Sequence, residues 1–216
     1  MNNLRIEKKF VFGKHKEDFL EKILITNGFT QVFSPREIES IYLDTENFDF
    51  AKDNINGVSK RKKLRFRWYN NDLTKIYLEE KNKQNFQVKK NVNKILIQTK
   101  RNNLVSNLKK YFNCIDSKYN NFNYKFILKT SYLRSYWISN DKKVRATIDK
   151  NLKASPITDL SKKLDLNETI LEFKFSPIQE NFFRSFYFEK NFNLRSKKFS
   201  KYIQSFNLLE DSGLIV

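Results

Sequence analysis

The chain has 216 residues, of which 39% are hydrophobic and 15% aromatic, so it can bury a core and is not intrinsically disordered. Its 42 Lys and Arg against 24 Asp and Glu give a net charge of +18, which favours a polyanionic partner: nucleic acid, an anionic membrane or a phosphate chain. The single Cys and single His exclude an internal disulfide and a thiolate metal cluster, and they argue against a histidine metal site.

The predicted elements alternate between strands and short helices over one domain that spans residues 1–216. Strands are expected at 4–12, 30–33, 38–43, 62–69, 74–83, 86–90, 122–139 (as one strand or two), 143–149 and 169–175. Helices are expected at 15–27, 47–56 (a short helix or a turn), 103–112, from Pro177 onward and at 198–208. The segment 160–166 is polar and stays open. The pattern indicates an α+β protein with mainly antiparallel strands.

Three local details sharpen these predictions. Phe19, Ile23 and Leu24 are spaced as the buried face of the first helix, and Leu104, Leu108 and Phe112 recur every four residues in the third. Between two strongly β-forming segments, residues 70–72 (Asn-Asn-Asp) predict a hairpin turn.

Charged side chains recur at every second position of five predicted strands. Because strand side chains alternate between two faces, each set lies on one face, opposite a mostly apolar one. The sets are Arg5, Glu7 and Lys9; Arg65 and Arg67; Glu79, Lys81 and Lys83, which share their face with Tyr77; Arg145, Thr147 and Asp149; and Glu172 and Lys174.

These charged faces have two interpretations. An antiparallel sheet that packs on one side leaves its polar face in solvent, and this is the ordinary explanation for any one strand. The alternative is a closed barrel whose interior is charged and whose apolar outside is covered by helices. Such an interior is costly unless a polyanion and a metal fill it. Arg suits phosphate oxygens, whereas Glu among the cations suits a divalent metal that phosphate also binds.

Several segments together resemble the catalytic domain of vacuolar transporter chaperone (VTC) polyphosphate polymerases, a branch of the triphosphate tunnel (CYTH-like) metalloenzymes. Each segment alone is a weak signal, and their joint order and spacing carry the resemblance over nearly the whole chain. In order, they are an opening R-x-E-x-K strand at 5–9, IYLDT at 41–45, KKLRFRWY at 62–69, EEK at 79–81 followed by VK at 88–89, Arg134, VRATID at 144–149, LEFK at 171–174 and KFSK at 198–201.

The resemblance implies a closed, eight-stranded antiparallel β-barrel, the triphosphate tunnel, with helices packed outside. It implies that the tunnel binds a triphosphate with Mn²⁺ or Mg²⁺. The implied phosphate ligands are Arg5, Lys9, Arg65, Arg67, Lys81, Lys89, Arg134, Arg145, Lys198 and Lys201, the last two one turn apart on the C-terminal helix. Glu172 is the implied metal ligand, with Glu7 as a second carboxylate, and catalysis is assigned to Arg65, Arg67, Lys81, Arg134, Arg145 and Glu172.

One departure from the wider superfamily bears on the reaction. Hydrolytic tunnel enzymes usually open with E-x-E-x-K, where two carboxylates handle metal and water, whereas Arg5 replaces the first carboxylate here and Glu7 remains. This favours a polymerase that transfers the γ-phosphate of ATP to polyphosphate. Two alternatives stay open: hydrolysis of inorganic, thiamine or RNA 5′ triphosphate (or cyclisation of ATP), and a non-catalytic module that binds polyphosphate or RNA.

The remaining expectations concern location and isolated residues. The sequence contains no apolar run long enough to cross a bilayer and no secretory signal, so a cytoplasmic protein is expected, with any membrane translocation left to a separate partner. Recognition of a specific nucleic-acid sequence is not expected. His15 is predicted at the surface, Cys114 as a small buried residue, and both Trp in packing, although Trp68 could also stack on a base.

Overall fold

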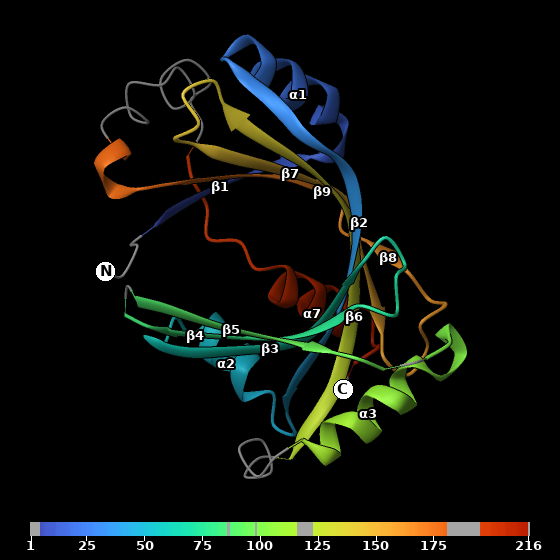
Figure 1. Ribbon diagram of the computed structural model, residues 1–216. Coiled ribbons are helices and arrows are strands. Elements are labelled where there is room, and N and C mark those ends of the chain that lie inside the picture. Colours follow the sequence, from blue (N-terminus) through green and yellow to red (C-terminus); the bar gives the residue numbers. More distant parts are fainter. Residues whose placement is uncertain (1–4, 86, 98, 116–122, 181–194, 216) are drawn as a thin grey trace. The chain divides into compact units, whose positions relative to one another are not determined.

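A computed structural model describes residues 5–85, 87–97, 99–115, 123–180 and 195–215 (Figure 1). The chain forms two compact units, each assembled from three segments. Unit 1 comprises residues 1–36, 132–152 and 166–200, and unit 2 comprises residues 37–131, 153–165 and 201–216. The single domain expected from the sequence therefore stays a prediction.

Unit 1 is built on antiparallel strands. β1 (Ile6–Gly13) pairs with β9 (Glu168–Phe175), and β9 pairs with the first part of β7 (Arg145–Pro156). Parts of β6 (Tyr124–Ser139) and β2 (Phe29–Thr45) complete the order β1-β9-β7-β6-β2. Two short 3-10 helices, η1 (Lys14–Lys16) and η3 (Pro177–Gln179), and the helix α1 (Glu17–Thr26) belong to the same unit.

The core of unit 1 lies between α1 and the apolar face of its strands. Leu20, Ile23 and Leu24 of α1 are buried with Phe10 and Phe173, whose rings meet edge to face. Phe19, predicted in this core, is 42% exposed. That prediction is wrong because the helix presents residues three and four apart, beginning at Leu20, to the strands.

Unit 2 continues the antiparallel order from β2 through β3 (Lys60–Tyr69) and β4 (Ile76–Gln84) to β5 (Gln87–Ile95). The two-residue strand β8 (Leu164–Asp165) pairs with the end of β7. Among its described residues, this unit has the helices α2 (Asp49–Ile55), η2 (Arg101–Asn103), α3 (Leu104–Cys114) and α7 (Lys201–Asp211). The predicted β3–β4 turn is confirmed, since Asn70 and Asn71 have left-handed φ values of 50° and 58°.

The core of unit 2 lies between the apolar face of β3 and the helix α3. Leu64, Phe66 and Trp68 are buried there in one cluster with the predicted helix stripe of Leu104, Leu108 and Phe112. Trp68 is 1% exposed, and its Nε1 donates a hydrogen bond to Glu39 Oε2 at 2.7 Å. Its ring therefore belongs to the core and offers no face to a base. α2 and α3 lie on one face of these strands and α7 lies on the other (Figure 1).

Some boundaries differ from the predictions. The expected strands 30–33 and 38–43 form one strand, β2; its pairing with β3 begins at Ile38, so Pro35 removes no hydrogen bond from that ladder. Cys114 is exposed rather than buried, because it lies two residues beyond Phe112 and off the buried stripe of α3. His15 is exposed, as expected. Of the helix expected from Pro177, η3 is described, and Phe182, Phe183 and Phe186 lie outside the described residues.

The α+β architecture with an antiparallel sheet is confirmed. The hydrogen-bonded order begins at β1 and ends at β5, and no ladder in the described residues joins these two strands. The closed barrel implied by the family resemblance is therefore not confirmed by hydrogen bonding. Within the same residues, no helix has the length and apolar character needed to cross a bilayer.

Candidate phosphate-binding and metal-binding faces

The charged face of unit 2 is organised around Glu79 on β4. Arg65 is its direct partner on β3 and donates to Glu79 Oε2 from Nε at 2.8 Å and from Nη2 at 2.6 Å. Lys90 Nζ on β5 lies 2.8 Å from Glu79 Oε1, and Arg67 Nη1 lies 3.6 Å from Oε2. Three cations from two neighbouring strands thus share one carboxylate, which leaves this face with excess positive charge.

Glu79 stays ionised in this setting. Burial raises its pKa, but the charges of Arg65, Arg67 and Lys90 outweigh that effect and lower the pKa to about 2. Burial is also the largest influence on Lys90, whose pKa falls below its ordinary value although Glu79 opposes the change. The carboxylate therefore acts as a fixed counter-ion between cations that would otherwise repel one another.

Arg65 is also held from the side of β2. Its Nη1 donates to the Tyr42 hydroxyl at 3.0 Å, and the Tyr42 ring stacks on Tyr202 of α7 with centroids 5.0 Å apart. The Tyr202 hydroxyl donates in turn to Asp44 Oδ2 at 2.5 Å. Burial is the main cause of the raised pKa of both Tyr202 and Asp44. This arrangement fixes one guanidinium on the face with aromatic and hydrogen-bonding support.

The lysines of β4 and β5 divide between the two faces. Lys81 is paired with Lys63 of β3 and with Lys90 of β5, so all three lie on the face of Arg65. Lys89, a predicted phosphate ligand, is paired with Asn82 and lies on the opposite face. Sequence reasoning missed Lys90. The buried Ile95 marks the core side of β5. Counting back in twos from Ile95 arrives at Lys89, so Lys90 lies on the opposite, charged side.

In unit 1, Arg134 of β6 is bound by Asp149 of β7. Nε donates to Asp149 Oδ1 at 2.5 Å and Nη2 to Oδ2 at 2.7 Å, a bidentate pair with a fully buried carboxylate. Burial opposes the charge of Arg134, but Asp149, with Tyr132 and Glu172, holds its pKa well above the ordinary value. The guanidinium is charged, and one of its edges is committed to Asp149.

Two carboxylates of unit 1 lie on either side of one lysine. Lys174 Nζ is 3.4 Å from Glu172 Oε1 on its own strand and 3.8 Å from Glu7 Oε1 on β1. Across the ladders, Glu172 faces Lys9 on β1 and Thr147 on β7. All of these side chains therefore lie on the charged face that the period-2 pattern predicts for β1, β7 and β9.

This group of side chains fits a divalent metal. The described residues include no cluster of three or more His, Cys, Asp or Glu that could hold one alone. Magnesium, however, is commonly bound through one or two carboxylates plus substrate phosphates. Glu172 and Glu7 could provide the carboxylates. Thr147 Oγ1 adds a second observation: it is buried, has no hydrogen-bond partner among the described residues, and lies directly opposite Glu172.

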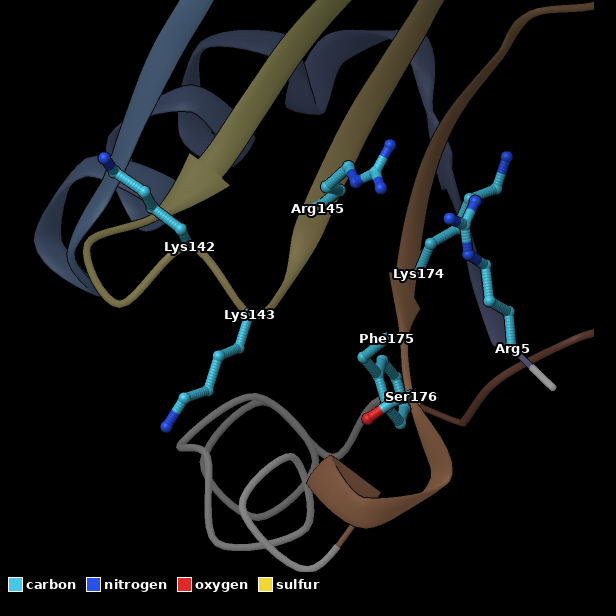
Figure 2. A pocket seen from close by; sticks show the side chains of 7 residues that line it. All are labelled: Arg5, Lys142, Lys143, Arg145, Lys174, Phe175 and Ser176. Atoms are coloured by element: carbon cyan, nitrogen blue, oxygen red, sulfur yellow. The ribbon is translucent and has the colours of Figure 1, made fainter. Parts of the chain in front are cut away.

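A pocket of about 250 Å³ opens at one end of this face (Figure 2). Figure 2 shows its lining on β7, on β9 and directly before β1, with two lysines on the turn that precedes β7. The lining residues are Arg5, Lys142, Lys143, Arg145, Lys174, Phe175 and Ser176. We call this the cationic pocket; it contains the predicted phosphate ligands Arg5 and Arg145.

The remaining predicted ligands are placed apart. Lys9 Nζ donates to the Phe199 carbonyl at 3.0 Å, and the Lys197 amide donates to the Lys9 carbonyl at 2.8 Å, so residues 197–199 run beside β1. Lys198 lies in this non-helical segment of unit 1, whereas Lys201 is the first residue of α7 in unit 2. The prediction that both lie one turn apart on a helix is wrong, because the helix begins three residues later than expected.

Residues 4–210 match the family model of the VTC domain. The chain belongs to the VTC domain family. No curated protein matches it. The match covers both units, including every strand that contributes to the two charged faces, and it confirms the resemblance seen in the sequence motifs.

Solved structures support the same fold at low sequence identity. A candidate adenylate cyclase from Bacillus halodurans aligns with a TM-score of 0.55 and 15% identity over 94% of this chain and 97% of its own. HpAC1 from Hippeastrum, a candidate adenylyl cyclase with a dominant triphosphatase activity, aligns with a TM-score of 0.55 and 13% identity over 98% and 97%. A protein from Pyrococcus horikoshii OT3 aligns at 0.52 and 16% over 95% and 99%. These similarities show that the chain shares the fold of these proteins.

Proposed function

We propose that this protein is a metal-dependent polyphosphate polymerase that transfers the γ-phosphate of ATP to a growing polyphosphate chain. Membership of the VTC domain family supports a triphosphate-binding enzyme. The observation that carries the finer proposal is Arg5: it lines the cationic pocket with Arg145 and Lys174, at the position where hydrolytic relatives usually have a carboxylate. A cation there favours an anionic acceptor over a water molecule that a carboxylate would orient.

Both charged faces would bind phosphate oxygens of the substrate. Arg65, Arg67, Lys81 and Lys90 would bind phosphate oxygens on unit 2, with Glu79 holding the guanidinium groups in position. Lys9, Arg134 and Arg145 would do so on unit 1. Phosphoryl transfer depends mostly on positioning and on neutralising the charge of the transferring group, and fixed guanidinium groups supply both. The closed tunnel that would enclose the substrate is part of this proposal.

A divalent metal fits beside Glu172. Glu172, Glu7 and the Thr147 hydroxyl would hold it, and Lys174 would give up its place between the two carboxylates. When bound, Mn²⁺ or Mg²⁺ would neutralise charge on the phosphates of the substrate. Arg134, whose pKa is well above the ordinary value, supplies a permanent positive charge nearby.

The reaction conserves the phosphoryl group. The terminal phosphate oxygen of the chain forms a bond to the γ-phosphorus, the bond from that phosphorus to the bridging oxygen breaks, and ADP leaves with the bridging oxygen. No water is consumed. The cations would stabilise both the incoming and the departing anions, which repel each other strongly in solution.

Triphosphatase activity is the second candidate, because the similar protein HpAC1 has a dominant triphosphatase activity. The same faces would then bind the substrate, and water would take the phosphoryl group. Transfer of product across a membrane, if it occurs, would depend on a separate membrane protein.

The deciding experiment is incubation of the purified protein with ATP and Mn²⁺, followed by separation of ADP, orthophosphate and polymer. The polymerase proposal requires ADP in step with ladder-forming polymer and little orthophosphate. Release of orthophosphate alone from ATP or inorganic triphosphate would replace it with the triphosphatase proposal. Chelation of the metal should stop either reaction.

A further inference from the structure

The cationic pocket contains a like-charge contact that the fold alone does not explain. Arg145 and Lys174 are direct cross-strand partners on β7 and β9, and like charges at such positions destabilise a sheet. Glu7 and Glu172 lie near Lys174, but the described residues give neither Arg145 nor Arg5 an ion pair. None of the seven residues that line the pocket is acidic. An anion bound there would remove the repulsion.

The pocket lies next to the candidate metal position along the strands. Lys174 lines the pocket and lies two residues along β9 from Glu172, a separation of roughly 6.6 Å at the usual rise of a strand. Arg145 has the same two-residue separation from Thr147 on β7, in the same direction across the ladder. A phosphate chain held at Glu172 can therefore run along the strands into the pocket.

The size and lining of the pocket favour phosphate over a nucleobase. Its volume of about 250 Å³ is below the usual range for drug-sized ligands. Its single aromatic residue, Phe175, is buried in the apolar core and leaves no ring face for stacking. The other lining groups are cations and the Ser176 side chain, which suit the repeated oxygens of a phosphate chain.

We propose that the cationic pocket is a chain-length subsite: it binds the phosphate units of polyphosphate that extend beyond a triphosphate bound at Glu172. This inference rests on the proposed function, because it presupposes that unit 1 binds phosphate beside Glu172. Lys142 and Lys143, on the turn before β7, also line the pocket (Figure 2), and the proposal assigns them to the longer chain and not to triphosphate. Long polyphosphate therefore binds more tightly than triphosphate.

The test compares two doubly substituted proteins in chelator, without added metal. Lys142→Ala with Lys143→Ala removes the outer charges of the pocket. Lys162→Ala with Lys163→Ala is the matched control, since both pairs are exposed, adjacent and preceded by an aspartate whose carboxylate accepts backbone hydrogen bonds. The affinities for orthophosphate, inorganic triphosphate and polyphosphate of about 60 units are measured by calorimetry for wild type and for both variants.

In the pocket variant, the dissociation constant for long polyphosphate should rise about fivefold, on the scale of two partly exposed charge contacts. Its affinity for triphosphate should stay within about twofold, and the control should lose little for either ligand. Equal losses for both chain lengths, or equal losses in the two variants, would overturn the chain-length subsite. If wild type binds triphosphate tightly and long chains no better, the subsite is absent while the proposed function stands. If wild type binds neither, the proposed function itself fails.

Discussion

The charged faces of the two units use their carboxylates differently. In unit 2, Glu79 is surrounded by Arg65, Arg67 and Lys90, and its pKa is lowered to about 2. In unit 1, Glu172 and Glu7 both lie near Lys174, whose Nζ is 3.4 Å from the first carboxylate and 3.8 Å from the second. A carboxylate with three cations is a counter-ion that holds a binding surface together, whereas two carboxylates that share one lysine can exchange it for a metal.

This difference separates stability from chemistry. The Glu79 carboxylate neutralises charges that would otherwise repel one another across β3, β4 and β5, so its loss should mainly reduce the stability of the folded protein. Glu172 faces a threonine hydroxyl that has no hydrogen-bond partner among the described residues, and it lies beside a lysine that a divalent cation could displace, so the loss of Glu172 should mainly reduce catalysis. The predictions below test this division.

The largest effect is expected for Glu172→Gln. The amide keeps the size of the side chain but weakens metal binding, so metal-dependent turnover of ATP should fall roughly 100-fold or more, the scale of losing one preorganised electrostatic group. Rates of ADP and polymer formation with Mn²⁺ measure this.

Metal-free binding of polyphosphate is the internal control for Glu172→Gln, since the cations of both faces remain. Its dissociation constant should change little or improve, because a negative charge has been removed from the surface that binds the anion. Full metal-dependent activity in this variant would exclude Glu172 as the metal ligand and leave Glu7 as the candidate.

Glu79→Gln should mainly reduce stability. The substitution leaves Arg65, Arg67 and Lys90 without their shared counter-ion, and the free energy of unfolding should fall by about 2–3 kcal/mol, below the full cost of breaking a buried pair because Lys90 is partly exposed. Urea denaturation measures it. Triphosphate should restore much of the loss by mass action, since its anionic oxygens replace the carboxylate. A variant as stable as wild type would show that Glu79 does not hold this face together.

The same residue predicts a pH dependence. Its pKa falls from an ordinary value of 4.5 to about 2 in the folded protein, so the stabilisation is fully present above pH 4.5 and is lost as the pH falls through about 2. The shift corresponds to about 3 kcal/mol at most. Wild type should therefore lose more stability than Glu79→Gln between pH 5 and pH 2. Parallel curves for the two proteins would contradict the assigned shift.

Thr147→Val tests the metal position without removing a charge. The valine is nearly isosteric, so the affinity for Mn²⁺, measured by electron paramagnetic resonance in the absence of nucleotide, should fall about tenfold as for other supporting ligands. Thr147→Ser should retain it. Thr130→Val is the matched control, because Thr130 in unit 2 also has a buried hydroxyl without a partner among the described residues. Equal metal affinity in Thr147→Val and Thr130→Val would remove Thr147 from the site.

The sequence was most informative where apolar residues mark the period. Leu64, Phe66 and Trp68 fix the buried face of β3, and the opposite face with Arg65 and Arg67 follows directly. The pairing of Arg134 with Asp149 could not be predicted in this way, because it depends on the register between β6 and β7. The α7 boundary was also missed, which moved Lys198 out of the helix.

The smallest predicted effect separates Lys89 from Lys90. The family resemblance assigns phosphate binding to Lys89, yet the predicted strand 86–90 was too short to include Ile95, the residue that shows which side of β5 is buried. In the structure Lys90 shares the face of Arg65 and Lys81, and Lys89 lies on the other. Lys90→Ala should therefore raise the dissociation constant for triphosphate by about fivefold, the scale of one charge-assisted contact that is partly exposed. Lys89→Ala removes the same charge from the opposite face of β5 and should change this dissociation constant by less than about twofold. Both variants are measured by calorimetry at the same ionic strength, so that a general loss of charge affects them alike. A larger loss in Lys89→Ala would mean that β5 presents its other face to the phosphate.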